Sequence, residues 1–422
     1  MISKEISKWL NIQRKKQYLI VKKVALSNLK NWEFNKKKIY HVSKKFFEIA
    51  GLRIKSNFYK KNSWDQPIIV QNEIGILGIL KNVKNNRYLL QAKVEPGNIN
   101  KIQISPTVQA TRSNYSRVHG GRMIPYLNYF KRNNKNFSLQ TEQAFRYFNK
   151  KNSNIVSFIS KKIDLDQNFR WFSKTEIANL LKEKNLINMD TLSVFSSFIK
   201  KKKIDFPLNN EKKIIDWKNS LNKKFFLKNK IIGLNSIKNW NLSKKKIFHK
   251  TNNYFSVIGI RVKTNKREIT EWDQPIIEGS KIGFVGYLSK NFKNTNHYLC
   301  RYILKPGSKQ GTYTCSVNTS KFVGYKKNKD LTNFQKNLIS NYFINSKAEI
   351  IYDNILSDEG GRFYHAQIKY MACKLNKNHK EIELPVNYIW LSQNQMIDLI
   401  NKQKIDIEAR LLFGIMNFKD TI

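Results

Sequence analysis

Apolar and polar residues alternate over several short stretches of this 422-residue chain. The alternation is clear in residues 46–56 (FFEIAGLRIKS) and 254–264 (YFSVIGIRVKT), and it predicts half-buried β-strands. Residues 68–80 and 87–95 predict further strands, interrupted by glycines. Several short strands of this kind predict sheets with one face turned toward a core.

Helical spacing of apolar residues appears once in each half of the chain. Its apolar positions are Ile177, Leu180 and Leu181 in the first half, and Met396, Leu399 and Ile400 in the second. Ser173 and Ser392 precede these segments at the N-cap position, so each half is predicted to close with an amphipathic helix. Strands flanked by helices predict an α+β fold with mixed sheets.

The two halves are copies of one sequence unit. The segment WDQPII at residues 64–69 recurs unchanged at residues 272–277, a shift of 208 residues. The same shift relates further pairs: Trp9 and Trp217, Trp32 and Trp240, His41 and His249, Arg53 and Arg261, Gly75 and Gly283. This period is far too long for a solenoid. It predicts a tandem duplication, with one domain in residues 1–205 and a second in residues 206–422.

The chain is strongly basic, with 78 Lys and Arg against 30 Asp and Glu and a formal net charge of +48. The excess is spread along the whole length, which favours a solvated surface; a dedicated surface for nucleic acid is the alternative. Three cysteines and six histidines lack the spacing of a disulfide framework or a metal site. No apolar stretch reaches the length of a membrane helix, and the first residues lack a secretory pattern. We expect a cytoplasmic protein.

Polar side chains of chemical interest gather in residues 91–126. In the strand before residue 95, Gln91, Lys93 and Glu95 point to one face, and a Pro-Gly turn follows. Thr107 and Gln109 on the returning strand are predicted to face the same cavity. Further along come Arg112, Asn114, Tyr115, Arg117, His119 and Arg122. These residue types predict a binding cavity with acid/base groups.

The run EPGNINKIQISPTVQATRSNYSRVHGGR, residues 95–122, resembles the NDP-hexose 2,3-dehydratases of deoxysugar biosynthesis. The resemblance extends over both WDQPII segments, residues 169–190, residues 359–370 and residues 407–413. It implies two tandem Nudix-like domains, a homodimer, and no cofactor or metal. The implied substrate is dTDP-4-keto-6-deoxy-D-glucose, and a 3-ketoreductase would act next. The paired glutamates of a Nudix hydrolase motif are absent from the sequence, so diphosphate hydrolysis is not expected.

Such a dehydratase removes the C3 proton made acidic by the 4-ketone, then expels the C2 hydroxyl as water. We expect Glu95 and His119 to act as acid and base, with Tyr115 and Arg112 donating to the keto oxygen or the leaving group. The expected substrate-binding residues are Trp64, Thr107, Gln109, Asn114, Arg117, Arg122, Arg362 and Tyr364. In this set, the arginines suit a diphosphate. A non-catalytic basic protein that binds nucleotides or nucleic acid is the alternative.

The second copy departs from the first at the predicted site. Counting with the 210-residue shift of the Pro-Gly turn places Lys305 at Glu95, Thr319 at Gln109 and Phe322 at Arg112. The second copy is therefore predicted to be structural, or to bind nucleotide without turnover.

Overall fold

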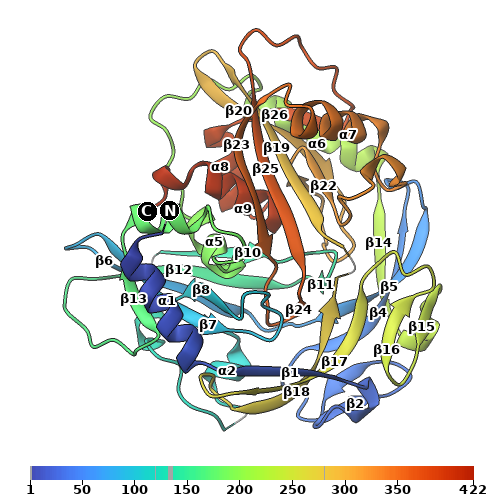
Figure 1. Cartoon of the computed structure of the whole chain (residues 1–422). Coiled ribbons are helices and arrows are strands. Elements are labelled where there is room, and N and C mark those ends of the chain that lie inside the picture. Colours follow the sequence, from blue (N-terminus) through green and yellow to red (C-terminus); the bar gives the residue numbers. More distant parts are fainter. Residues whose placement is uncertain (1, 119, 132–135, 280) are drawn as a thin grey trace.

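The computed structural model describes residues 2–118, 120–131, 136–279 and 281–422. It is a mixed α/β protein, built mostly of sheets and organised as two repeated halves (Figure 1). Each half contributes one smaller and one larger sheet. Both larger sheets combine antiparallel pairs with one parallel pair, β12 with β6 in the first and β25 with β19 in the second. The predicted mixed-sheet class is thus confirmed.

The smaller sheets have equivalent strands. The first contains β2 (Trp32–Phe34), β3 (Ile39–His41), β4 (Glu48–Ser56), β5 (Ser63–Val70), β11 (Tyr147–Phe148) and β14 (Leu227–Ile232). The second contains β1 (Leu19–Val24), β15 (Trp240–Leu242), β16 (Lys246–His249), β17 (Ser256–Thr264), β18 (Glu271–Glu278) and β24 (Phe363–Tyr364).

The larger sheets are equivalent too. The first contains β6 (Gly75–Asn82), β7 (Arg87–Val94), β8 (Ile102–Pro106), β9 (Val108–Ala110), β10 (Phe137–Thr141), β12 (Lys151–Ile159) and β13 (Phe169–Phe172). The second contains β19 (Gly283–Phe292), β20 (Thr295–Ile303), β21 (Thr312–Thr314), β22 (Val317–Thr319), β23 (Glu349–Ser357), β25 (Gln367–Leu375) and β26 (Tyr388–Ser392).

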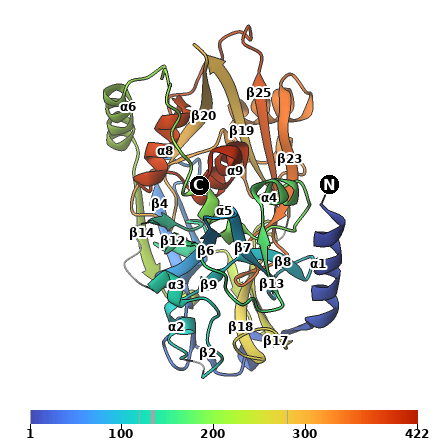
Figure 2. The ribbon, with the colours of Figure 1, turned by 90° about the vertical axis from the view of Figure 1, so that its left-hand side faces the viewer.

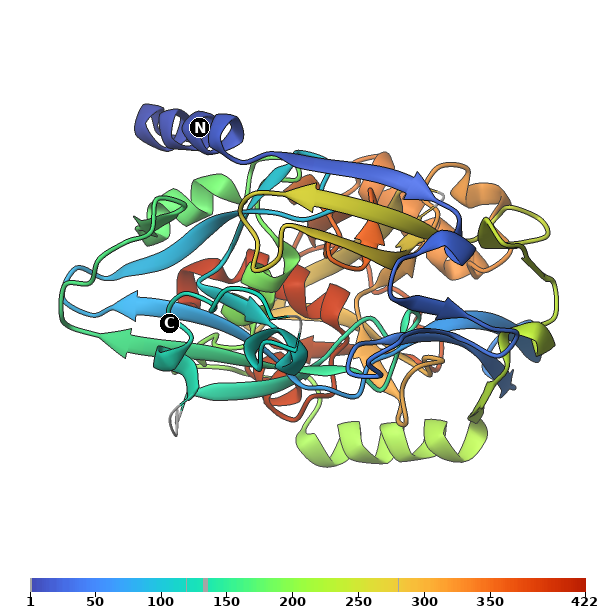
Figure 3. The ribbon, with the colours of Figure 1, turned by 90° about the horizontal axis from the view of Figure 1, so that it is seen from below.

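The two halves exchange a strand. Strand β1, from the first half, pairs antiparallel with β17, from Leu19 opposite Thr264 to Val24 opposite Gly259. Strand β14, from the second half, pairs in the same way with β4 of the first. Viewed from below, β1 runs beside β17 along one edge of the molecule (Figure 3). Each small sheet therefore needs a strand from beyond the predicted boundary between residues 205 and 206.

Strands β6 and β7 diverge, and the returning chain fills the gap between them. They pair only near their hairpin, up to Leu80 opposite Leu89; beyond it β8 pairs with β7 and β9 pairs with β6. Thr107 lies where the two strands separate. Its hydroxyl accepts from the Leu80 amide at 2.9 Å and donates to the Leu89 carbonyl.

Ser316 makes the same pair of bonds in the second half. Its hydroxyl accepts from the Leu288 amide at 2.8 Å and donates to the Leu299 carbonyl at 2.7 Å. Because both halves keep this hydroxyl buried at the same branch point, the contacts of Thr107 stabilise the sheet. They place the Thr107 side chain inside the sheet, away from the cavity to which the sequence assigned it.

The helices confirm the N-caps and correct the predicted ends of the halves. Both α4 (Lys174–Leu180) and α8 (Gln393–Asn401) begin with capping boxes at Ser173 and Ser392. However, neither helix closes its half, because α5 (Met189–Ser196) and α9 (Ile407–Met416) follow. The remaining α-helices are α1 (Lys4–Lys16), α2 (Arg112–Tyr115), α3 (Asn128–Lys131), α6 (Glu211–Lys224) and α7 (Asn333–Leu338).

Helices α5 and α9 pack against each other in the centre of the molecule (Figure 2). Almost every residue of both is buried, so neither shows the one-sided apolar pattern that marks a surface helix. This is why the sequence pattern missed them. They belong to one large apolar cluster with residues of both halves, so the halves share a core. In the ranges that the structure covers, no helix has the length and apolar character needed to cross a membrane.

Candidate active site

Glu95 lies at the end of β7 and is 2% exposed. One carboxylate oxygen accepts from Gln109 Nε2 at 3.1 Å, and the other accepts from Asn188 Nδ2 at 3.3 Å. The first oxygen also lies 3.4 Å from Lys93 Nζ and 3.5 Å from an Arg267 guanidinium nitrogen. Among the described residues, these four side chains form the polar surroundings of the Glu95 carboxylate. We call Lys93, Glu95, Gln109, Asn188 and Arg267 the Glu95 cluster.

The diverging strands bring Lys93 and Gln109 together. Lys93 projects from β7 on the face opposite Leu90 and Ala92, as its alternation predicts, and Gln109 projects from β9. Lys93 Nζ donates to Gln109 Oε1 at 2.9 Å, which leaves the amide nitrogen of Gln109 to face Glu95. The predicted placement of Gln109 beside Glu95 is what the structure shows.

Asn188 connects the cluster to a buried helix. As the N-cap of α5, it accepts from the Asp190 amide at 2.8 Å through its side-chain oxygen. Its side-chain nitrogen then donates to Glu95 and, at 3.2 Å, to Gln103 Oε1. A single amide thus begins the helix and holds the carboxylate.

Burial and neighbouring charges shift the titrating groups of this region. Burial lowers the pKa of Lys93, and the Arg267 charge lowers it further, against the opposing effect of Glu95. Burial acts to raise the pKa of Glu268, but Arg267 and Lys93 outweigh burial and bring it to about 2. Asp190 has a pKa well above its usual range, because it is buried among other carboxylates. A buried carboxylate beside a lysine of lowered pKa provides a proton acceptor and a proton donor.

The arginine-rich segment after β9 lies at the surface. Short helix α2 starts directly after β9, and Glu73 anchors it by accepting from the Ser113 amide at 2.6 Å. Arg112, Arg117 and Arg122 are exposed, and Tyr115 and Asn114 are half-buried. The described contacts of Glu95 come from its own cluster and not from Arg112 or Tyr115. His119 lies outside the described residues.

Trp64 lies beside the turn of the second half. Its indole donates to Gln66 Oε1 at 3.1 Å, and its ring meets Tyr59 edge-on at 5.2 Å. Tyr59 in turn donates to the Leu304 carbonyl, next to Lys305. The repeated tryptophan on the Glu95 side is Trp272, whose ring lies 5.9 Å from the Arg267 guanidinium. The structure therefore associates Trp272, and not Trp64, with the Glu95 cluster.

Arg362 and Tyr364 lie in a segment, residues 360–365, that meets the turn after Glu95 through its backbone. Gly97 donates its amide to the Gly360 carbonyl at 2.7 Å and accepts from the His365 amide at 3.0 Å. The Arg362 guanidinium instead stacks on Phe47 at 4.1 Å, and the Tyr364 ring stacks on His365 at 4.1 Å.

The contact of Arg362 has an equivalent in the other half. Arg146 stacks on Phe255 at 4.2 Å, so each arginine packs on an aromatic ring of the opposite repeat. Contacts repeated in this way join the two halves.

An internal ion pair occupies the equivalent of the Glu95 position in the second half. Lys305 is 1% exposed, and its Nζ lies 2.6 Å from Asp406 Oδ2 and 3.1 Å from Glu408 Oε2. Asp406 is the N-cap of α9, as Asn188 is of α5. The first half has the Glu95 carboxylate and the Asn188 amide here, and the second half has Lys305 with the carboxylates of Asp406 and Glu408. The charges at this position of the second half are therefore already paired.

Strand register corrects two of the predicted equivalences. Gln109 pairs with Leu77, and Asn318 pairs with Val285, which is the equivalent of Leu77. Asn318 therefore corresponds to Gln109, and Lys321 to Arg112; the assignments of Thr319 and Phe322 are wrong by one residue. The error arises because the loop after the Pro-Gly turn is one residue shorter in the second half.

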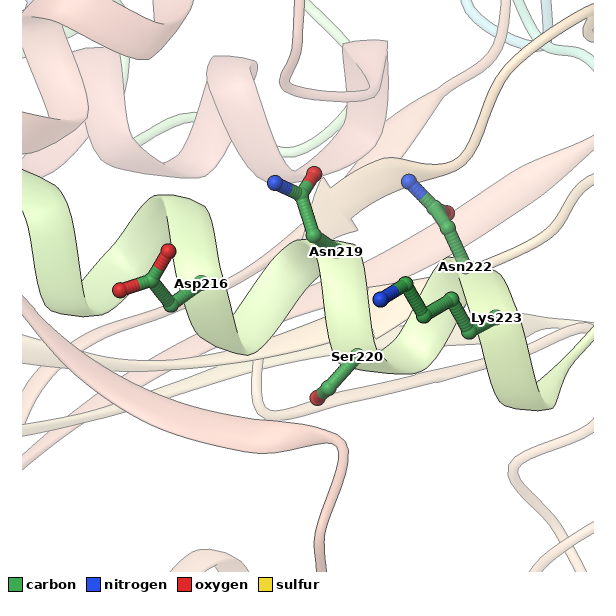
Figure 4. Close-up of a pocket in the computed structure, with 5 residues that line it drawn as sticks. All are labelled: Asp216, Asn219, Ser220, Asn222 and Lys223. Atoms are coloured by element: carbon green, nitrogen blue, oxygen red, sulfur yellow. The ribbon is translucent and has the colours of Figure 1, made fainter.

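A surface depression lies elsewhere, along α6 (Figure 4). Its lining residues are Asp216, Asn219, Ser220, Asn222 and Lys223, all from this one helix. None of them belongs to the Glu95 cluster, so the depression and the acid/base groups are separate features.

Sequence reasoning missed Asn188, Arg267 and Glu268, and placed Lys93 on the correct face without assigning it a role. A signal for Arg267 and Glu268 was present in the duplication. The hairpin that carries them, residues 265–270, corresponds to residues 57–62, where Tyr59 and Lys60 stand instead. Charge differences between two copies mark positions that the copies use differently.

Glu359 adds a titrating group beside the site. Its carboxylate accepts from the Gly361 amide at 2.8 Å and lies 3.5 Å from the Tyr147 hydroxyl. Burial, followed by the charge of Glu95, raises the pKa of Glu359 to about 7. The folded state therefore binds this proton more tightly than the unfolded chain does. This contribution to stability is full below the unfolded pKa, near 4.5, and is lost as the pH rises to about 7.

Glu359→Gln should remove that pH dependence. We expect the unfolding free energy of the variant, relative to wild type, to increase by about 2–3 kcal/mol between about pH 5 and about pH 8, measured by urea denaturation. Glu381→Gln, at an exposed carboxyl, is the matched control and should follow wild type. Parallel curves for wild type and Glu359→Gln would contradict the expected protonation of Glu359.

The sequence model of the NDP-hexose 2,3-dehydratases matches this chain twice, over residues 3–198 and residues 211–416. The chain therefore belongs to the NDP-hexose 2,3-dehydratase family. The two matched segments confirm the predicted duplication.

Three curated relatives are each named dTDP-4-dehydro-6-deoxy-alpha-D-glucopyranose 2,3-dehydratase. The protein of Streptomyces violaceoruber is 30% identical, over 89% of this chain and 88% of its own length. That of Saccharopolyspora spinosa is 28% identical, over 94% and 87%. That of Amycolatopsis orientalis is 28% identical, over 99% and 90%. These matches confirm the predicted enzyme class and lend no support to the nucleic-acid-binding alternative.

Proposed function

We propose that this protein dehydrates dTDP-4-keto-6-deoxy-D-glucose across C2 and C3. The proposal rests on the family match over both halves of the chain. It is supported by the buried carboxylate of Glu95 beside the buried Lys93, at the end of β7. The three curated relatives carry this substrate in their names, and each aligns with this chain over 87–90% of its own length.

The reaction needs a base near C3 and an acid near the C2 hydroxyl. Glu95 takes the C3 proton, and the electron pair moves toward the 4-ketone to form an enolate. The C2–O bond then breaks, and the hydroxyl leaves as water after receiving a proton. Lys93, whose pKa is lowered by burial, is the neighbouring donor in the cluster. Tautomerisation of the resulting enol gives a 3,4-diketo-2,6-dideoxy sugar.

Binding of the nucleotide is assigned to the segment after β9. Arg112, Arg117 and Arg122 lie exposed within eleven residues of each other, and guanidinium groups match the geometry of a diphosphate. Tyr115 and Asn114 are half-buried in the same segment, within reach of solvent. We propose that this segment covers the substrate over the Glu95 cluster, and that Tyr115 and Arg112 donate to the keto oxygen or the leaving group. His119 is proposed as a further acid/base group.

Further properties implied by the family resemblance belong to the same proposal. We propose that each repeat has a Nudix-like fold, that two chains form a homodimer, and that the enzyme works in the cytoplasm without a cofactor. Its product, a vicinal diketone, is reactive, so a 3-ketoreductase that reduces it next is the proposed functional partner.

The test is turnover of the purified protein. Incubation with dTDP-4-keto-6-deoxyglucose and a 3-ketoreductase should yield a nucleotide sugar that has lost one water, detected by mass spectrometry. In deuterated water without the reductase, the product should carry solvent deuterium at the positions that tautomerise. An absence of turnover with dTDP-linked, UDP-linked and GDP-linked keto sugars would contradict the proposal.

A further inference from the structure

We propose that the second repeat completes the active site of the first, with Arg267 as the residue that positions the Glu95 carboxylate. This inference rests on the proposed function. It assigns to the second repeat a part in positioning the proposed base, in addition to its part in the fold.

Arg267 reaches Glu95 from a hairpin of the second repeat. The hairpin joins β17 and β18, and the Arg267 side chain is 14% exposed. One guanidinium nitrogen lies 3.3 Å from the Val94 carbonyl and 3.5 Å from Glu95 Oε1. The Nε atom lies 3.2 Å from Glu268 Oε2. Because Glu268 holds the near end of the guanidinium, its far end is directed at the end of β7.

The same hairpin also contacts the arginine-rich segment. The main-chain carbonyl of Glu268 accepts from the Arg122 amide at 2.9 Å. Arg267 and Glu268 thus touch both ends of residues 94–122, the strand end before Glu95 and the last arginine of the segment. A hairpin with both contacts sets the distance between the acid/base cluster and the proposed diphosphate-binding arginines.

The equivalent hairpin of the first repeat lacks these charges. Tyr59 stands at the Arg267 position and donates to the Leu304 carbonyl, the counterpart of Val94. Lys305, at the Glu95 position, is paired within its own repeat by Asp406 and Glu408. The backbone contact is therefore common to both hairpins. Among the described residues, an ion pair from the hairpin to the side chain at the Glu95 position is found for Arg267 and not for the Tyr59 hairpin. This asymmetry separates the positioning role of Arg267 from a purely structural one.

Arg267 also acts on the other members of the cluster. Its charge contributes to the lowered pKa of Lys93 and to the low pKa of Glu268. Without Arg267, the Glu95 carboxylate keeps Lys93, Gln109 and Asn188, but loses the ion pair that the second repeat supplies. A carboxylate that turns by a fraction of an ångström away from C3 loses catalytic efficiency while the nucleotide still binds.

The experiment compares Arg267→Gln and Arg267→Lys with Tyr59→Phe, the matched change in the other hairpin. We expect Arg267→Gln to lower kcat by about 10- to 100-fold, with KM changed less than about threefold. Arg267→Lys should recover part of the loss, and Tyr59→Phe should stay within about twofold of wild type. Binding of dTDP, measured by calorimetry, should be preserved in all three.

Two results would overturn the inference while wild type remains active. One is a kcat for Arg267→Gln equal to that of wild type; the other is an equal loss in Arg267→Gln and Tyr59→Phe. If Arg267→Gln is poorly folded, the double variant Arg267→Gln/Glu268→Gln avoids an unpaired buried carboxylate, and the same kcat comparison applies to it. An inactive wild type would instead contradict the proposed function itself, and with it this inference.

Discussion

Glu95→Gln should lower kcat by about 10²- to 10⁴-fold while the protein remains folded, because an amide cannot accept the C3 proton. The substitution keeps the shape of the side chain in a position that is 2% exposed. Its amide oxygen can still accept from Gln109 or from Asn188, while its NH2 group faces the other donor. Steady-state kinetics with the coupled reductase measure the loss, and calorimetric binding of dTDP shows whether the substrate site persists.

Glu142→Gln is the matched control for the loss of a buried carboxyl in the same half. Glu142 Oε1 accepts from Asn152 at 2.8 Å, outside the Glu95 cluster. Burial raises the pKa of Glu142, so the neutral glutamine resembles the protonated acid. We expect kcat within about threefold of wild type for this control. A Glu95→Gln enzyme that retains more than a tenth of the wild-type kcat would exclude Glu95 as the base.

Gly97→Ala should destabilise the protein by about 2–4 kcal/mol and displace the turn that follows Glu95. A Cβ atom at this position would lie 1.8 Å from the Phe363 carbonyl oxygen and 2.8 Å from that of Gly360. Both atoms are backbone, so relief requires movement of the 360–365 loop or of the turn. Because the turn carries Glu95, kcat should fall as well. Urea denaturation and kinetics measure the two effects.

Two other glycines give the comparison its controls. Among the described residues, the atoms that a Cβ at Gly279 would meet belong to Ala366, 3.6 and 3.8 Å away, so Gly279→Ala should change stability by less than about 1 kcal/mol. A Cβ at Gly307 would lie 1.8 Å from the Tyr147 carbonyl oxygen. Gly307→Ala should therefore destabilise the protein as Gly97→Ala does, with a smaller effect on kcat, since Lys305 replaces Glu95 there. Equal stability of Gly97→Ala and wild type would show that the two loops do not make this contact.

These predictions depend on how the two repeats are joined. The repeats exchange β1 and β14, dock their Pro-Gly turns on each other's loops, and stack Arg146 and Arg362 on each other's aromatic rings. In the second repeat, Lys305 stands at the Glu95 position and is held there by an internal ion pair. The second repeat also supplies the first with a strand, a loop and a hairpin.

The sequence by itself determined the duplication, several central strands of the sheets, both capped helices and the face that Lys93, Glu95 and Gln109 share. Each of these follows from local periodicity, capping chemistry or self-comparison, and all three can be read from the order of residues along the chain. Only the tertiary structure decided that Arg267 and Asn188 reach Glu95. It also decided that the Thr107 hydroxyl forms its hydrogen bonds within the sheet, and that Trp272, and not Trp64, lies near the Glu95 cluster. These contacts join residues that are far apart in the chain, through strand exchange and through a helix buried on all sides. Local periodicity contains no signal for the exchange or for such a helix.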